Sequence, residues 1–174
     1  MVLPSFYLAP ARYYAQLQAG ASVVIDTGEH FVKQTYRNRC IILSPAGPLN
    51  LIIPVEHGDL SHRAMKDVRL SRHSPWQRNH WHALCTCYNS SPFFEFYGPD
   101  LEPLYTRRWE WLTDFNEALR SLLCRWLFVD TEITLSLQYT GTPPPPFPEG
   151  ELSVVHLLFN YGNEAMLHLH DYEN

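Results

Sequence analysis

The sequence predicts a mixed α/β fold (α+β) in which a central β-sheet, built mostly from the N-terminal half, packs against helices from the second half. Short β-branched runs between turn residues mark the first 70 positions, whereas apolar residues recur at helical spacing after position 75. The chain has 174 residues, of which 45% are hydrophobic and 18% charged. These values indicate one domain, over residues 1–174, with a sizeable core.

The first elements are a short helix and a buried strand. Apolar residues at helical spacing predict a helix over residues 13–19, which Gly20 ends. The β-branched residues 22–25 predict a buried strand that ends at Asp26. A loop that begins with Asp26 is therefore expected at the edge of the sheet.

A hairpin and a further strand follow. Residues 36–43 and 49–55 are two extended runs, and the Pro and Gly residues between them favour a short loop. Residues 66–70 are expected to form a strand because Val68 and Leu70 share one face, with charged residues on the other.

The second half is predicted to be mostly helical. Pro75 is a suitable first residue for a helix that continues to about residue 88. The strongest helical pattern runs over residues 109–126, with a broad apolar face opposite charged residues. Alternating apolar residues then predict a last strand within residues 131–139.

A proline-rich connector separates this body from the C-terminal tail. Residues 141–148 contain four consecutive prolines and predict an extended, semi-rigid segment. Residues 151–174 are expected to dock back on the body, with two short helical turns interrupted at residues 161–163.

The charge distribution argues against nucleic-acid binding. The formal net charge is −5, whereas proteins that bind nucleic acid through general electrostatics need a broadly basic surface. Residues 33–78 nevertheless carry a local charge of +5. This basic block is either a solvated face or a region that attracts a small anionic or phosphate-bearing ligand.

The absence of targeting signals and cofactor motifs from the sequence limits the cellular compartment and the cofactors that we expect. The N-terminus lacks the features of a secretory leader, and no apolar run approaches the ~20 residues that span a bilayer, so a cytoplasmic protein with free thiols is expected. No dinucleotide, phosphate-loop, serine hydrolase or zinc protease motif is present, and no cofactor is identified. The His and Cys residues at 80–87 do not converge on a strand or helix, so no metal site is predicted.

The best candidate for ligand binding is the sequence Tyr36-Arg37-Asn38-Arg39. On a strand, Arg37 and Arg39 would project from one face about 6.6 Å apart, where two guanidinium groups can hold a phosphate or carboxylate. Lys33 would add a third positive group if its loop folds over that face. The alternative is that the arginines pair with acids such as Asp26 or Glu29.

Two residues are candidates for a general base. Asp26 stands at the end of a predicted strand, where a carboxylate can accept a proton but more often caps a turn. His30 is the alternative base because the unperturbed pKa of imidazole lies near neutral pH.

The chain resembles the WbqC-like family over nearly its whole length. The most specific matching element is Tyr36-Arg37-Asn38-Arg39 with its upstream Asp26 and Lys33. Other matching elements are Pro-aromatic, apolar or helical in character and include Pro4-Ser5-Phe6-Tyr7, Leu51-Ile52-Ile53-Pro54-Val55, Trp76-Gln77, His80-Trp81 and Ser91-Pro92-Phe93-Phe94. The sequence departs from the family at Val2-Leu3, where a Gln, often preceded by His, usually stands.

The resemblance implies a bacterial protein of surface-polysaccharide (O-antigen) biosynthesis, a family in which some members are described as glycine or aminoacyl transferases. The first hypothesis is a small transferase that acylates an amino sugar or nucleotide sugar. Arg37 and Arg39 would bind phosphates, with Lys33, Tyr36 and Asn38 contributing to substrate binding and Asp26 or His30 as base. The alternative is a non-catalytic binding or scaffolding protein with a protein partner or a homo-oligomeric state, marked by an exposed aromatic patch that involves Trp109 and Trp111.

Overall fold

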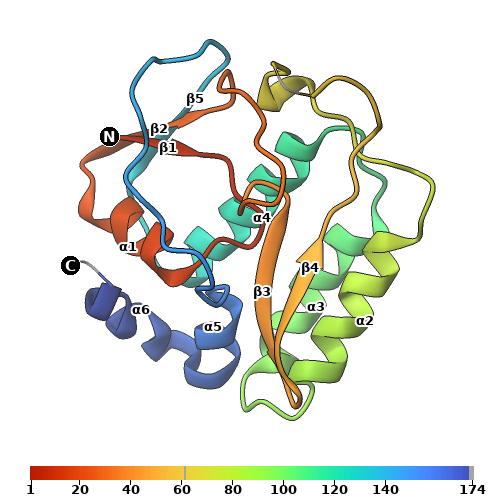
Figure 1. The fold of residues 1–174 in the computed structure, drawn as a ribbon. Coiled ribbons are helices and arrows are strands. Elements are labelled where there is room, and N and C mark those ends of the chain that lie inside the picture. The colour runs from red at the N-terminus through yellow and green to blue at the C-terminus, as the bar shows by residue number, and fades with distance from the viewer. Residues whose placement is uncertain (61, 173–174) are drawn as a thin grey trace.

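Strands mostly from the first half and helices mostly from the second half form one mixed α/β domain, which confirms the predicted class (Figure 1). The computed structural model describes residues 1–60 and 62–172. Within these residues the strands form two sheets rather than one central sheet, namely a three-stranded parallel sheet and a two-stranded antiparallel hairpin.

The parallel sheet has the order β1-β2-β5. Strand β1 (Val2–Pro4) leads through helix α1 (Ala11–Ala19) to β2 (Ser22–Asp26), which lies in the centre. The predicted last strand is present but shorter, as β5 (Glu132–Ser136), and pairs in parallel with β2. The β-branched residues of β2 suit this position because a central parallel strand is buried on both faces.

The hairpin consists of β3 (Arg39–Ser44) and β4 (Gly47–Ile52), joined by a tight turn in which Gly47 has φ of +114°. The hairpin is therefore confirmed, although its first strand begins at residue 39 and not at residue 36. The earlier residues instead form a turn, in which the backbone N–H of Asn38 donates to the carbonyl of Thr35 at 3.2 Å.

The strand predicted for residues 66–70 is wrong. A single 3-10 turn, Met65–Asp67, occupies its first part. Both Met65 and Val68 are fully buried, and this spacing of three matches a 3-10 turn better than a strand. Only isolated bridges follow, one of which joins Arg69 to Trp111.

Three helices that follow the hairpin in the chain pack in succession against one another. Helix α2 (Trp76–Tyr88) follows the prediction, and α4 (Leu112–Trp126) begins three residues later than predicted because Trp111 is used in the bridge to Arg69. Helix α3 (Phe94–Thr106) was not predicted as a separate element, since it contains two prolines. Tertiary packing overrides those prolines, because α3 buries residues at helical spacing: Phe94, Tyr97, Leu101 and Tyr105.

Buried aromatic side chains connect the N-terminal segment with these helices. The Tyr7 hydroxyl lies 2.9 Å from Nδ1 of His80 and 2.9 Å from the Tyr105 hydroxyl. The rings of Tyr7 and Trp76 both pack on Phe115. The phenol groups are therefore buried with hydrogen-bond partners, as buried polar groups require.

After β5 the chain crosses one face as an extended segment, residues 141–150, which is called the strap below. It leads to α5 (Val155–Tyr161) and α6 (Ala165–His168), which lie beside α1 in Figure 1. The backbone N–H of Val154 donates to the carbonyl of Ala9 at 3.0 Å and thereby joins this tail to the N-terminal segment. In the described residues, no helix has the length and apolar character to cross a membrane.

Candidate functional site

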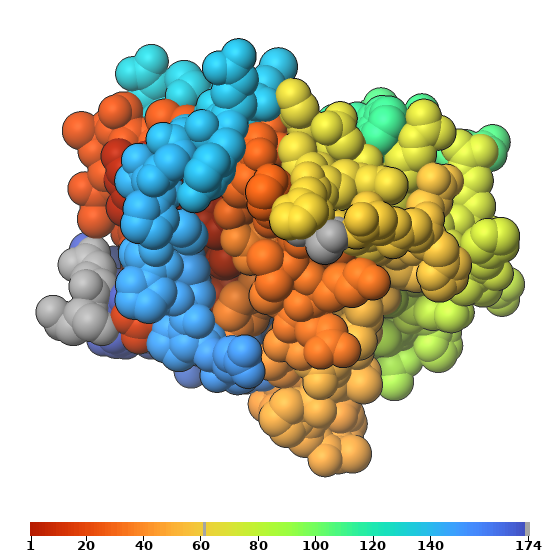
Figure 2. Space-filling model, turned by 45° about the horizontal axis from the view of Figure 1, so that its top comes forward, coloured from red at the N-terminus to blue at the C-terminus, as the bar shows by residue number. Residues whose placement is uncertain are grey.

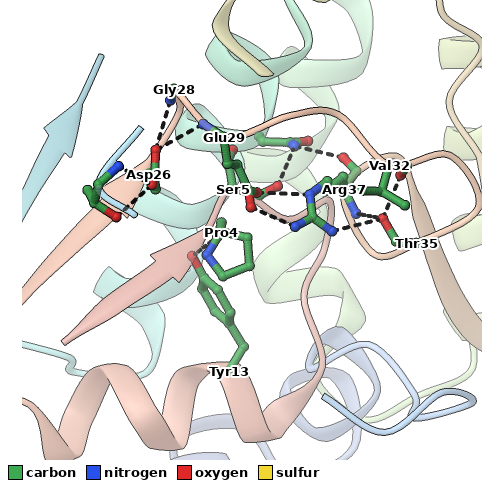
Figure 3. Close-up of polar contacts among 11 residues, drawn as sticks. Pro4, Ser5, Tyr13, Asp26, Gly28, Glu29, Val32, Thr35 and Arg37 are labelled. Atoms are coloured by element: carbon green, nitrogen blue, oxygen red, sulfur yellow. Dashed lines mark hydrogen bonds and ion pairs between the residues drawn. The ribbon is translucent and has the colours of Figure 1, made fainter. Parts of the chain in front are cut away.

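The residues that the sequence singles out lie on the segment 26–39, which connects β2 with β3. Figure 3 shows Asp26, Glu29 and Arg37 in succession along this segment, above the N-terminal strand and α1. Their polar contacts separate residues that hold the segment in place from residues that face a cleft.

The carboxylate of Asp26 forms hydrogen bonds within the protein that hold two loop segments in place. Its Oδ1 atom accepts the backbone N–H groups of Gly28 and Glu29, both at 3.0 Å. Its Oδ2 atom accepts the backbone N–H of Thr140 at 2.9 Å and the Thr140 hydroxyl at 2.8 Å. Asp26 is only 3% exposed. Asp26 therefore caps the turn that follows β2, as one of the two sequence alternatives expected. It also binds the segment that follows β5.

Arg37 is paired with Glu29 rather than free. Its Nε and Nη2 atoms donate to the two carboxylate oxygens of Glu29 at 2.8 and 2.7 Å, and Nη1 donates to the Thr35 hydroxyl at 3.3 Å. Burial raises the pKa of Glu29 above its ordinary value, although the hydrogen bonds and charge of Arg37 act in the opposite direction. The charge of Arg37 is therefore largely compensated inside the protein.

The geometry predicted for the two arginines is wrong in one respect. Arg37 precedes β3 in a turn, and Arg39 is the first residue of that strand, so the pair does not project from one strand face. Both arginines nevertheless line the same cleft. The Nε atom of Arg39 is buried and has no hydrogen-bond partner within the described residues.

This cleft, called the strap cleft below, has a volume of about 280 Å³ and lies between residues 35–39 and the strap. In Figure 2 the strap (blue) runs along one face, with the orange segment that includes residues 30–39 to its right and red atoms of the N-terminal segment between them. The rings of Phe6, Tyr36 and Phe147 line it.

Tyr36 and Phe147 attach the strap to the body. The Tyr36 hydroxyl donates to the carbonyl of Pro148 at 2.7 Å and accepts the backbone N–H of Glu151 at 3.0 Å. The ring of Phe147 packs against Phe6, with centroids 5.0 Å apart, and against Tyr13 at 5.9 Å. Burial raises the pKa of Tyr36. The hydroxyl is therefore a neutral hydrogen-bonding link.

The remaining predicted residues do not line the strap cleft. Asn38 is buried, and its Nδ2 atom donates to the carbonyl of Ile53 at 3.0 Å, which ties the turn to the end of the hairpin. Lys33 is exposed. His30 is also exposed, and its ring lies 5.5 Å from that of His62. The structure therefore brings Tyr36, Arg37 and Arg39 together and leaves Asp26, His30, Lys33 and Asn38 outside the cleft.

Comparison with known protein families identifies the chain. The model of the WbqC-like protein family matches residues 5–144. The chain belongs to the WbqC-like family. No curated protein and no solved structure matches it.

Only part of the lining of the strap cleft in this WbqC-like protein lies within the residues that match the family model. Phe6, Tyr36 and Arg39 lie within the matched residues, whereas Phe147 and Glu149 lie beyond them. Glu149 places a carboxylate in the lining and was missed by sequence reasoning, which treated the proline run only as a connector. Glu149 follows the proline run and carries no sequence signal of its own. Only the fold, which brings the strap over the arginines, places it beside them.

The His and Cys residues of α2 form no metal centre. Among residues 1–60 and 62–172, no group of three or more His, Cys, Asp or Glu side chains is arranged to hold a metal ion. His80 instead faces the Tyr7 hydroxyl, and burial lowers the pKa of His80 to about 4.

A larger aromatic cleft lies elsewhere on the WbqC-like fold. It has a volume of about 560 Å³ and is lined by residues of α3 and α5 that include Phe96 and Tyr161, which are 67% and 43% exposed. The aromatic patch predicted around Trp109 and Trp111 is less exposed than this cleft. Both rings are half-buried, and an arginine covers each of them.

Proposed function

We propose that this WbqC-like protein is a small transferase that modifies an amino sugar or nucleotide sugar in surface-polysaccharide (O-antigen) biosynthesis. The family resemblance implies the carbohydrate pathway. The strap cleft would bind the sugar ring, and the whole chain, with its strap and tail, would act as one WbqC-like domain in the cytoplasm. Acyl thioesters and nucleotide sugars are both available in that compartment.

The observation that carries the proposal is the composition of the strap cleft. Three aromatic rings, from Phe6, Tyr36 and Phe147, stand beside the charged groups of Arg39 and Glu149. A pyranose ring combines apolar C–H faces with polar hydroxyl or amino groups, and ligand sites generally combine an apolar lining with a few placed polar groups. The volume of about 280 Å³ suits one sugar ring rather than a complete nucleotide sugar.

The proposed reaction is acyl or aminoacyl transfer from a thioester to the sugar amine. The amine nitrogen attacks the carbonyl carbon, the new C–N bond forms, and the C–S bond breaks to release a thiolate. The amine must lose a proton, which a carboxylate can accept. We assign this role to Glu149 in place of Asp26, because Glu149 lines the cleft and Asp26 uses both oxygens in internal hydrogen bonds.

A non-catalytic binding or scaffolding protein is the second candidate. The α3–α5 cleft favours it, since the exposed rings of Phe96 and Tyr161 provide an apolar surface of the kind that receives a protein partner or a second copy of the chain.

The test is a binding titration followed by a turnover assay. Glucosamine and galactosamine, with glucose for comparison, would be titrated by calorimetry into the wild type and into Arg39→Ala and Glu149→Gln. Exposed Arg125, on α4, provides the matched control Arg125→Ala. Acyl-coenzyme A donors would then be added one at a time, and mass spectrometry would detect the acylated sugar.

The two candidate functions give different results. Sugar binding that is lost in both cleft variants and kept in Arg125→Ala, together with acylated product, supports the transferase. Binding without product from any donor supports the non-catalytic candidate. Equal binding in the wild type and both cleft variants, or no binding of any sugar, contradicts the assignment of the strap cleft.

A further inference from the structure

A second cleft lies where α2 begins, and the proposed function does not use it. It has a volume of about 360 Å³ and is called the α2 cleft below. Three segments form its walls, namely residues 70–72, residues 74–78 and the chain around residues 105–109. The first two belong to the basic block of residues 33–78, for which the sequence left open a solvated face or a region that attracts an anionic ligand.

Three arginines line this cleft without a counter-charge among the described residues of its lining. Arg72, Arg78 and Arg108 line it, and none of the described lining residues is an acid. None of the three forms an ion pair within the described part of the chain. Neighbouring Arg69, in contrast, pairs with Glu110 at 3.2 Å. The α2 cleft thus concentrates positive charge in a protein whose formal net charge is −5.

The walls of the α2 cleft are held together independently of any ligand. The Nε2 atom of Gln77 lies 3.2 Å from the carbonyl oxygen of Tyr105 and 2.8 Å from that of Arg107. The indole N–H of Trp109 donates to the carbonyl of Leu104 at 2.8 Å. The first turn of α2 is therefore fixed to the segment that carries Arg108, so ligand binding needs little reorganisation.

Further donors are available in the same cleft. Trp76 is only 6% exposed and lines the cleft, and its indole N–H has no hydrogen-bond partner in the described residues. Helix α2 has no acid in its first turn and no side-chain hydrogen bond at its N-cap, Pro75. The positive end of a thirteen-residue helix adds to the field of the three arginines.

We propose that the α2 cleft binds the diphosphate group of a nucleoside diphosphate or its ester. A diphosphate carries several negative charges and enough oxygen atoms to accept hydrogen bonds from three guanidinium groups, whereas one carboxylate has only two oxygens. The volume of about 360 Å³ leaves space beside Trp109 for the attached nucleoside. The site goes beyond the proposed transferase reaction, because it lies outside the strap cleft and involves none of its residues.

The experiment is a calorimetric titration of the full chain with inorganic pyrophosphate, uridine diphosphate and adenosine diphosphate. The variant is Arg78→Ala with Arg108→Ala, and the controls are Arg125→Ala and the strap-cleft variant Arg39→Ala. We expect saturable binding of the diphosphates to the wild type. Removal of two charge-assisted contacts should weaken binding by about a hundredfold, and both controls should bind as the wild type does.

Melting curves without ligand would establish that each variant is folded, which is expected because Arg78 and Arg108 are exposed. No saturable binding to the wild type overturns the proposal, as does equal binding by the double variant or equal weakening in Arg125→Ala. Binding of inorganic pyrophosphate without either nucleoside diphosphate overturns the assignment of a nucleotide. Loss of sugar binding in Arg39→Ala, with diphosphate binding intact, would separate this site from the strap cleft.

Discussion

Arg37 and Glu29 form a two-bond ion pair, with distances of 2.8 and 2.7 Å, and their side chains are only 12% and 9% exposed. The Nδ2 atom of Asn116 also donates to the carbonyl of Arg37 at 2.9 Å, which fixes the same turn to α4. Arg37, which the sequence assigned to a substrate phosphate, therefore also holds in place the segment that lines the strap cleft.

Glu29→Gln should destabilise the protein by about 3 kcal/mol, because it leaves the guanidinium of Arg37 buried without a counter-charge. The free energy of unfolding from urea denaturation would measure this loss. Arg37→Ala with Glu29→Gln should recover part of the stability, since the double variant contains no unpaired charge. Arg37→Ala with unchanged stability but weaker binding of simple anions would instead favour the anion clamp that the sequence suggested.

The sequence was informative where local pattern and tertiary environment agree. The β-branched residues of β2 and the amphipathic residues of α2 and α4 have one stable arrangement, in which the apolar side is buried. Helix α3 was not predicted because its prolines are poor helix residues, and only contacts with other elements outweigh them.

The candidate site was only partly predictable for a related reason. The sequence shows that Arg37 and Arg39 are close along the chain, but not that Thr35 turns the backbone and that Glu29 reaches Arg37. The strap cleft also depends on Glu149, more than a hundred positions later, whose approach is a property of the folded chain. Long-range contacts of this kind leave no signal in a single sequence.

His80 should make the protein less stable in acid. Burial lowers the pKa of His80 to about 4 in the folded state, although a hydrogen bond with the backbone of Ile52 acts in the opposite direction. Between pH 4 and about 6.5 the unfolded state binds more protons, so stability falls as the pH decreases through this range. The loss at pH 4 should be about 3 kcal/mol, and urea denaturation from pH 7 to pH 4 would measure it.

His80→Gln is the matched variant, because an amide can still bond to the Tyr7 hydroxyl but does not titrate. The carboxylates titrate equally in both proteins, so the difference between the two pH profiles isolates His80. Parallel profiles for the wild type and His80→Gln would show that the buried imidazole does not control acid stability.

Phe147→Ala should release the strap. The half-buried Phe147 ring packs on Phe6 and Tyr13, and its removal should cost about 1–2 kcal/mol, less than the ~3–5 kcal/mol typical of a fully buried Phe. Proteolysis within residues 141–150 should become faster and sugar binding should weaken. Phe128→Ala, at an exposed position outside the strap cleft, is the control. Unchanged proteolysis in Phe147→Ala would mean that the Phe147 ring is not needed to hold the strap and that hydrogen bonds such as those of Tyr36 suffice.

The three arginines of the α2 cleft should have opposite effects on stability without and with ligand. Arg72→Ala, Arg78→Ala and Arg108→Ala together remove three like charges that line one cleft, so the free protein should be as stable as the wild type or slightly more stable. Pyrophosphate at about 100 times its dissociation constant should stabilise the wild type by about 2.7 kcal/mol, or ~5–11 °C in melting temperature, but leave the triple variant unchanged.

In melting curves the melting temperature of the wild type should therefore exceed that of the triple variant only when pyrophosphate is present, which a purely structural role for the arginines does not predict. A triple variant that melts well below the wild type without ligand would show that the arginines stabilise the fold itself. Sodium chloride should reduce the pyrophosphate effect on the wild type, because exposed guanidinium groups are screened beyond about 3 Å at 1 M salt. A salt-independent shift would place the bound anion away from these exposed charges.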